Sequence, residues 1–166
     1  LGGVRGVLNT VAKEARGRVT PGREAPLKRV LLSLFRYDAG RALRRVIDLE
    51  TLAQRAGCTV AELDAVVAPF VLRRLFVFGG ASGERRDVTG EVIRTRTLEV
   101  AHEALFDAWE EYRQLIKNHG PMQSLHADVQ AAASRWAAQN YDANELWGDG
   151  VLLRRAEDAR NRGEVE

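Results

Sequence analysis

Apolar residues along this chain recur mostly at the three- and four-residue spacing of amphipathic helices. Residues 3–15, "GVRGVLNTVAKEA", predict a first helix, which a Gly- and Pro-containing stretch then interrupts. Pro26 suits the first turn of a second helix, because its missing N–H would have no helical partner there. The apolar faces are predicted to hold Val4, Leu8, Val11 and Ala15 in the first helix, and Leu27, Val30, Leu31, Leu34 and Phe35 in the second.

Two short helices with recognisable end signals follow. Asp48 can cap the first of them, and Gly57 can end it. Thr59 and Glu62 have the spacing of a capping box, in which each side chain bonds the other residue's backbone N–H. The two helices are therefore expected to meet at a tight turn between Gly57 and Thr59.

Residues 75–100 change from a helical to an extended pattern. Residues 75–79 are apolar and aromatic, turn-forming residues fill 79–90, and several β-branched residues occur in 91–100, which predicts two strands joined by an exposed loop. A helix, a turn, a second helix and a β-hairpin form the order of a winged-helix domain. The expected fold class is therefore mainly α, with a winged-helix domain that has a small β-hairpin, followed by a helical extension.

From Ala101 the helical pattern returns and continues to "HGP" at 119–121, which is expected to end that helix. A further long helix and a last, shorter one follow. These breaks divide the chain into a first helix with a linker (1–25), a winged-helix domain (26–118) and a helical arm (119–166).

Composition places the chain among globular proteins, since 29% of its residues are charged and 45% are hydrophobic. No run approaches the roughly 18 apolar residues that a membrane span needs. No leader-like segment opens the chain, and the lone Cys58 cannot form an internal disulfide. We therefore expect a cytoplasmic protein with no membrane partner.

The charge of the chain is distributed unevenly. Its net charge is only +2, but residues 1–57 carry 12 Lys and Arg against 5 Asp and Glu, a balance of +7. Such a basic region suits nucleic acid, the phosphates of a nucleotide or an acidic neighbouring domain. A solvated, arginine-rich helix surface explains it equally well.

Motifs for catalysis are missing from the sequence. No G-x-x-x-x-G-K-[ST] loop is present to cradle phosphates, and the Gly-rich residues 79–86 favour a flexible wing tip. The histidines and the cysteine lack the spacing of a zinc site; they are His102, His119, His126 and Cys58. We therefore expect no catalytic residue and no metal ligand in this chain.

Two parts of the sequence resemble a known family. "LGGVRGVLNTVAKEA" opens the chain, and "LEVAHEALFDAWEEYRQLI" is followed by "AAASRWAAQNYDANELWGDGVLLRRAEDA". Together they look like the bacterial novel-STAND group of STAND-class P-loop NTPases, which is related to NACHT proteins and AP-ATPases. The resemblance implies that 1–25 ends a helical lid and that 119–166 leads to a C-terminal repeat sensor.

The same resemblance gives His102 a role. In related ATPases, a Met-His-Asp-type motif lies where a strand meets a helix, and its histidine contacts the β-phosphate of ADP. Ala101, His102 and Glu103 occupy the matching place, but the residues on both sides of His102 depart from the motif, so only His102 is carried over. Glu103 is interpreted first as an acidic residue favoured by the helix dipole.

The function implied is regulation of a STAND NTPase, in which His102 holds the ADP-bound resting state and the arm relays sensor input. ADP or ATP would be bound mainly by a P-loop domain absent from this chain, and activation would form a homo-oligomer. The plainer reading of His102 is a corner residue that donates to a backbone carbonyl and packs on Leu105 and Phe106.

Two other functions stay open. A DNA-binding winged helix would place residues 60–72 in the major groove and use Arg85 and Arg86 on phosphates, but Glu62 and Asp64 argue against DNA as a partner. A purely architectural helical linker is the second alternative.

Overall fold

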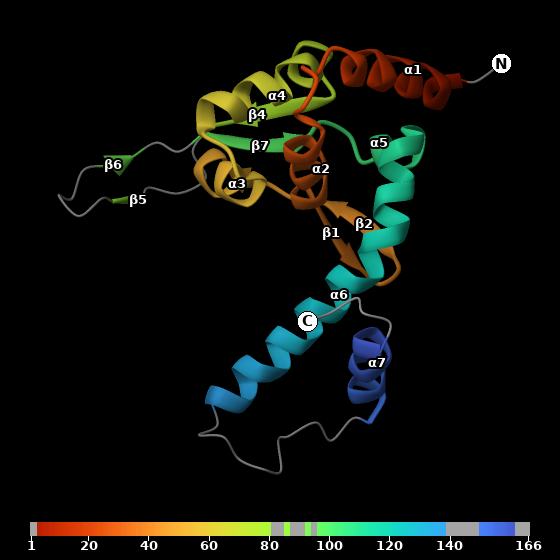
Figure 1. Cartoon of the computed structure of the whole chain (residues 1–166), viewed down its shortest axis with the longest axis vertical. Coiled ribbons are helices and arrows are strands. Elements are labelled where there is room, and N and C mark those ends of the chain that lie inside the picture. Colours follow the sequence, from red (N-terminus) through yellow and green to blue (C-terminus); the bar gives the residue numbers. More distant parts are fainter. Residues whose placement is uncertain (1–2, 81–84, 87–91, 94–95, 139–149, 162–166) are drawn as a thin grey trace.

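The computed structural model describes residues 3–80, 85–86, 92–93, 96–138 and 150–161. The protein is mainly helical, with small antiparallel sheets (Figure 1). The helices are α1 (Gly3–Gly17), α2 (Glu24–Ser33), α3 (Leu49–Ala56), α4 (Val60–Leu72), α5 (Ala104–Ala108), α6 (Glu110–Ala138) and α7 (Gly150–Asn161). The strands are β1 (Phe35–Asp38), β2 (Arg41–Arg44), β3 (Ile47–Asp48), β4 (Phe76–Gly79), β5 (Arg85–Arg86), β6 (Val92–Ile93) and β7 (Thr97–Val100).

A three-stranded sheet of order β3-β7-β4 lies beside α2, α3 and α4 (Figure 1). Phe76 pairs with Val100 across the antiparallel β4 and β7, and Ile47 pairs with Leu98 across β3 and β7. β1 pairs only with β2, and β5 pairs only with β6, among the described residues. The predicted order of two helices followed by two paired strands is confirmed; the edge strand β3 was not predicted.

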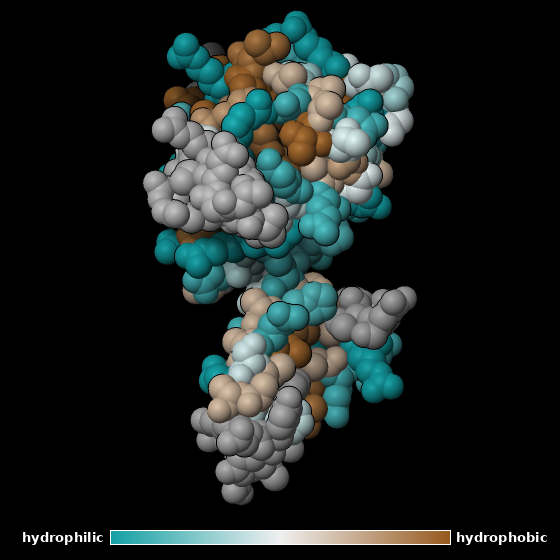
Figure 2. All heavy atoms as spheres, turned by 90° about the vertical axis from the view of Figure 1, so that its left-hand side faces the viewer, coloured by the Kyte–Doolittle hydropathy of each residue, from teal (hydrophilic) through white to brown (hydrophobic). Residues whose placement is uncertain are grey.

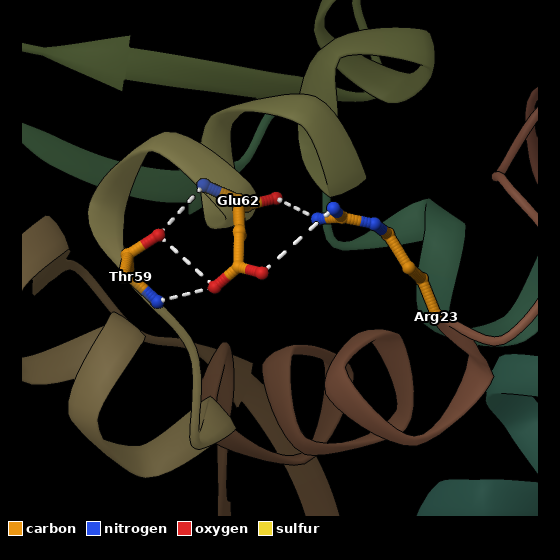
Figure 3. A network of polar contacts seen from close by, with 3 residues as sticks. All are labelled: Arg23, Thr59 and Glu62. Carbon is orange, nitrogen blue, oxygen red and sulfur yellow. Dashed lines mark hydrogen bonds and ion pairs between the residues drawn. The ribbon is translucent and has the colours of Figure 1, made fainter.

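Local end signals explain why α3 and α4 form where they do. The Asp48 carboxylate accepts from the Thr51 N–H at 2.8 Å, and Gly57 ends α3 in the left-handed region at φ 71°. Thr59 and Glu62 form the predicted capping box at the start of α4 (Figure 3). These predictions needed only neighbouring residues, and all of them are confirmed.

The core is mostly aliphatic, contains a group of contacting aromatic rings, and lies between the sheet and helices α1 to α6. Phe70 stacks on Phe76 with ring centroids 4.9 Å apart, and Trp109 lies 5.4 Å from Phe70. Tyr112 is fully buried and donates its hydroxyl to the Leu31 carbonyl at 2.8 Å. Trp109 is also completely buried in this core, although its indole N–H has no partner in the described part of the chain.

A hairpin replaces the end of the predicted second helix. The apolar stripe continued through Phe35, but α2 ends at Ser33 and Phe35 begins β1. Ala39 and Gly40 join β1 to β2 with φ values of 45° and 81°, as the tight two-residue turn of a hairpin requires. Phe35 is still completely buried, so its apolar character was read correctly and its backbone conformation was not.

The helix after β7 also differs from the prediction in two places. Trp109, with ψ 109°, separates α5 from α6, whereas a single helix was expected. The expected end at "HGP" is wrong, because α6 runs from Glu110 to Ala138 through Pro121. The predicted boundary between residues 118 and 119 thus lies inside α6, and the division into domains remains a prediction.

Helix α1 packs on α4 and α5 with most of the predicted face, since Ala15 is buried and Leu8 and Val11 pack against the core. Ala12 and Ala15 are buried, whereas Val4 is 76% exposed. Glu14 pairs at 2.7 Å with Arg73, the residue directly after α4, and Arg16 pairs with Glu111 of α6 at 3.2 Å. Val4 is thus the one residue of the predicted apolar face that does not pack on the core.

The distal half of α6 leaves this body as an arm, and α7 packs against it (Figure 1). Figure 2 shows the body and the arm as two lobes joined at a narrow waist. Within the described residues, no helix is both long enough and apolar enough to cross a membrane.

Candidate functional site

His102 lies in the short link between β7, which ends at Val100, and α5, which begins at Ala104. The Ala101 N–H donates to the Leu75 carbonyl at 2.9 Å and fixes the start of this link. The residue His102 itself is exposed, and its imidazole has no hydrogen bond or ion pair with any described residue. It is therefore not the packed, carbonyl-bonded corner residue of the plainer alternative.

Glu103 joins this junction to the hairpin. Its carboxylate accepts from the Arg44 backbone N–H at 3.2 Å and lies 4.0 Å from the Arg44 Nε. The Arg44 Nη1 is 3.5 Å from a carboxylate oxygen of Glu99 on β7. Sequence reasoning missed these contacts, because nothing local indicates that Glu103 meets a residue 59 positions earlier.

The start of α5 offers little to an anion. This helix has only five residues, and the N–H groups of Leu105 and Phe106 already bond the carbonyls of His102 and Glu103. A helix this short has a weaker macrodipole than a longer helix, and it has fewer free N–H groups at its start to bind an anion. A phosphate at this junction would depend on the imidazole of His102, next to a Glu103 carboxylate that Arg44 partly neutralises.

A surface hollow of about 450 Å³ opens beside the junction, between the hairpin and α5 and α6. Its floor includes the buried Phe106, and its walls include Arg41, Glu103 and Lys117. Arg41 and Lys117 have no ion pair with a described residue, so the hollow has cations available for an anion. His102 does not line the hollow. Glu103 does line it, and Glu103 directly follows His102 in the sequence.

The remaining candidate residues of the sequence analysis do not converge on His102. His119 lies within α6, where burial, followed by the charge of Lys28, lowers the pKa of its imidazole. His126 is exposed on the arm. Cys58 is half-buried between α3 and α4, and burial raises the pKa of its thiol. No group of His, Cys, Asp and Glu in the described segments could hold a metal ion.

The outer side of α4 is not a basic surface. Glu62 pairs with Arg23 at 3.8 Å (Figure 3), and Asp64 pairs with Arg96 at 2.5 Å. Arg73 is directed to Glu14 of α1, and Leu72 is 79% exposed. Three arginines around α4, namely Arg23, Arg73 and Arg96, are thus paired with acidic residues of the chain rather than available for phosphates. The side chains of Arg85 and Arg86 lie outside the described residues.

The comparisons with known proteins give one family. The family model described as nSTAND1, Novel STAND NTPase 1, matches residues 1–144. No curated protein and no solved structure matches the chain.

Proposed function

Because this chain belongs to the novel STAND NTPase 1 family, we propose that it is a regulatory segment in which His102 contacts the phosphate of ADP. The nucleotide would be held mainly by a P-loop domain of a longer cytoplasmic protein, and the contact would stabilise its resting state. The helices and the three-stranded sheet form a winged-helix domain in this proposal, α1 ends a lid, and α6 and α7 form the arm toward a repeat sensor.

The observation that carries this proposal is the exposure of His102 at the strand–helix junction, with its imidazole free of any described partner. An exposed imidazole at a fixed backbone position can donate to an anion from another domain without first breaking an internal bond. The order β3, α3, α4, β4, β7 and the sheet order β3-β7-β4 support the winged-helix assignment. The pairing of Arg23 with Glu62 and of Arg96 with Asp64 makes DNA the weaker candidate partner.

One charge-assisted hydrogen bond contributes about 1.5–3 kcal/mol, which corresponds to a factor of about 10 to 100 in affinity. His102 would therefore not bind ADP alone, but it would bias a domain arrangement that has two states of similar free energy. Sensor input through the arm would move the winged helix away, release ADP and allow a homo-oligomer to assemble.

The test is His102→Ala in the full-length protein, with ADP affinity and basal signalling measured. We expect ADP affinity to fall about tenfold or more and basal activity to rise. His126→Ala is the matched control, because His126 is also exposed but lies on the arm. If His102→Ala leaves ADP affinity and basal activity unchanged, His102 has no part in the switch and the architectural linker becomes the better function.

A further inference from the structure

The β1–β2 hairpin has two outer edges, and each is bonded by a side chain from a different part of the chain. Phe35 pairs with Arg44 and Tyr37 with Ala42, and the Arg45 N–H bonds the Leu34 carbonyl. In an antiparallel ladder, bonded and non-bonded pairs alternate. The N–H groups of Tyr37 and Arg44 therefore point away from the partner strand, where a two-stranded ribbon would otherwise leave them without a protein acceptor.

The outer edge of β2 is bonded to the His102 junction. The Glu103 carboxylate accepts from the Arg44 N–H at 3.2 Å, while the Arg44 side chain reaches both Glu103 and Glu99. Glu103 is the residue directly after His102. The backbone that carries the imidazole is thus attached to β2 as well as to the end of β7.

The outer edge of β1 is bonded to the arm. The Gln123 side chain accepts from the Tyr37 N–H at 3.0 Å through Oε1 and donates to the Leu32 carbonyl at 3.0 Å through Nε2. Both ends of one amide are therefore satisfied by backbone groups of the body. Gln123 lies in α6 just beyond Pro121, where the arm leaves the body.

The same region of α6 is in close contact with β1. The ring of Tyr37 lies so near the backbone of Gly120 that a Cβ at position 120 would be 2.5 Å from Cδ2 of the ring. Pro121 removes one backbone hydrogen bond from α6 at this point. A change in the direction of the arm would have to break both bonds of Gln123 and shift Tyr37 relative to Gly120.

We propose that Glu103 and Gln123 are positioning residues that couple the direction of the arm to the His102 junction through the β1–β2 hairpin. The strand ladder links the two bonded amides, Tyr37 on β1 and Arg44 on β2, so displacement of one strand displaces the other. The regulatory meaning of this coupling rests on the function proposed for His102, whereas the coupling itself does not require a nucleotide.

Amide hydrogen exchange and the NMR signals of the His102 imidazole test the coupling in the full chain. Gln123→Ala should raise the exchange rate of the Tyr37 amide at least about threefold, the value of one ordinary hydrogen bond. The Arg44 amide should also exchange faster, and the His102 signals should shift. Gln114→Ala is the matched control, because Gln114 is on the same helix and, among the described residues, its side chain bonds only Glu110. This variant should change none of these signals.

If the two hairpin edges are coupled, a change at Glu103 must also affect the Tyr37 amide that Gln123 bonds. Glu103→Ala should speed exchange at Arg44 and, to a smaller extent, at Tyr37, and Glu103→Gln should restore much of the protection because its amide oxygen can still accept. The proposal is overturned if Gln123→Ala affects Tyr37 while Arg44 and His102 remain unchanged, since the two edges would then be independent.

The outcomes separate this inference from the proposed function. If the Tyr37 and Arg44 amides respond together but His102→Ala leaves ADP affinity unchanged, the hairpin couples the arm to the junction and the proposed nucleotide switch is wrong. If the two amides respond independently but His102→Ala weakens ADP binding, the nucleotide switch is supported and the hairpin has no part in it.

Discussion

Gly120→Ala is expected to destabilise the protein, although replacing glycine by alanine inside a helix usually stabilises it. The gain in helix propensity is about 1 kcal/mol. Against it, the new methyl group would lie 2.5, 2.8 and 2.9 Å from Cδ2, Cε2 and Cγ of Tyr37, which belong to one rigid ring. Overpacking of this kind costs about 1–3 kcal/mol. The difference is a net loss of up to about 2 kcal/mol in the free energy of unfolding.

Gly6→Ala is the matched control for this prediction. Gly6 lies inside α1, and no atom is within 4 Å of the position that its Cβ would occupy. Only the propensity gain applies, so this variant should gain about 0.5–1 kcal/mol. Urea unfolding followed by circular dichroism measures both. In a Tyr37→Ala background, Gly120→Ala should become neutral or stabilising, because the ring is gone. A Gly120→Ala protein as stable as Gly6→Ala would refute the close contact.

Two further variants test local bonds. Thr59→Ala should lower the free energy of unfolding by about 1 kcal/mol, because it removes the capping box. Thr10→Ala, at an exposed site within α1, should not lower it. The measurement is the midpoint of urea unfolding, with the dependence of the free energy on urea concentration unchanged. Tyr112→Phe should cost about 0.5–1.5 kcal/mol by removing the hydroxyl's hydrogen bond to the Leu31 carbonyl, which would keep only the 3.4 Å bond from the Leu34 N–H. Burial raises the pKa of Tyr112 above its usual 10.0, so its contribution is complete below that pH and is lost as pH rises above it. Stability should therefore decline more steeply above pH 10 in the wild type than in Tyr112→Phe, and equal slopes would contradict the assignment.

Features that depend on neighbouring residues were predictable from the sequence. The caps at Asp48 and Thr59 and the helix end at Gly57 follow from short-range hydrogen bonds and from the freedom of glycine at positive φ. The strands of the β1–β2 hairpin were not predicted, because the residues of its turn carry no strong local hairpin signal. Ala39 adopts a positive φ that alanine rarely adopts, so the sequence contains no Asn-Gly or Asp-Gly signal for this hairpin.

Features set by tertiary contacts were not predictable. Gly120 and Pro121 are typical of a helix end, yet Gln123, Leu125 and the Tyr37 ring hold α6 in place on both sides of them. Likewise, the sequence singled out His102 only through a family resemblance. The contact between Glu103 and Arg44 gave no sequence signal, because it joins residues that are far apart in the chain.

The bonding of both hairpin edges has a consequence for self-association. A short, free-standing ribbon with unsatisfied outer N–H groups is a template onto which a strand from another molecule can add. Here one outward amide on each strand is already occupied, that of Tyr37 by Gln123 and that of Arg44 by Glu103. A strand from another copy of the chain would therefore have to displace one of these two side chains to bond the full length of either edge.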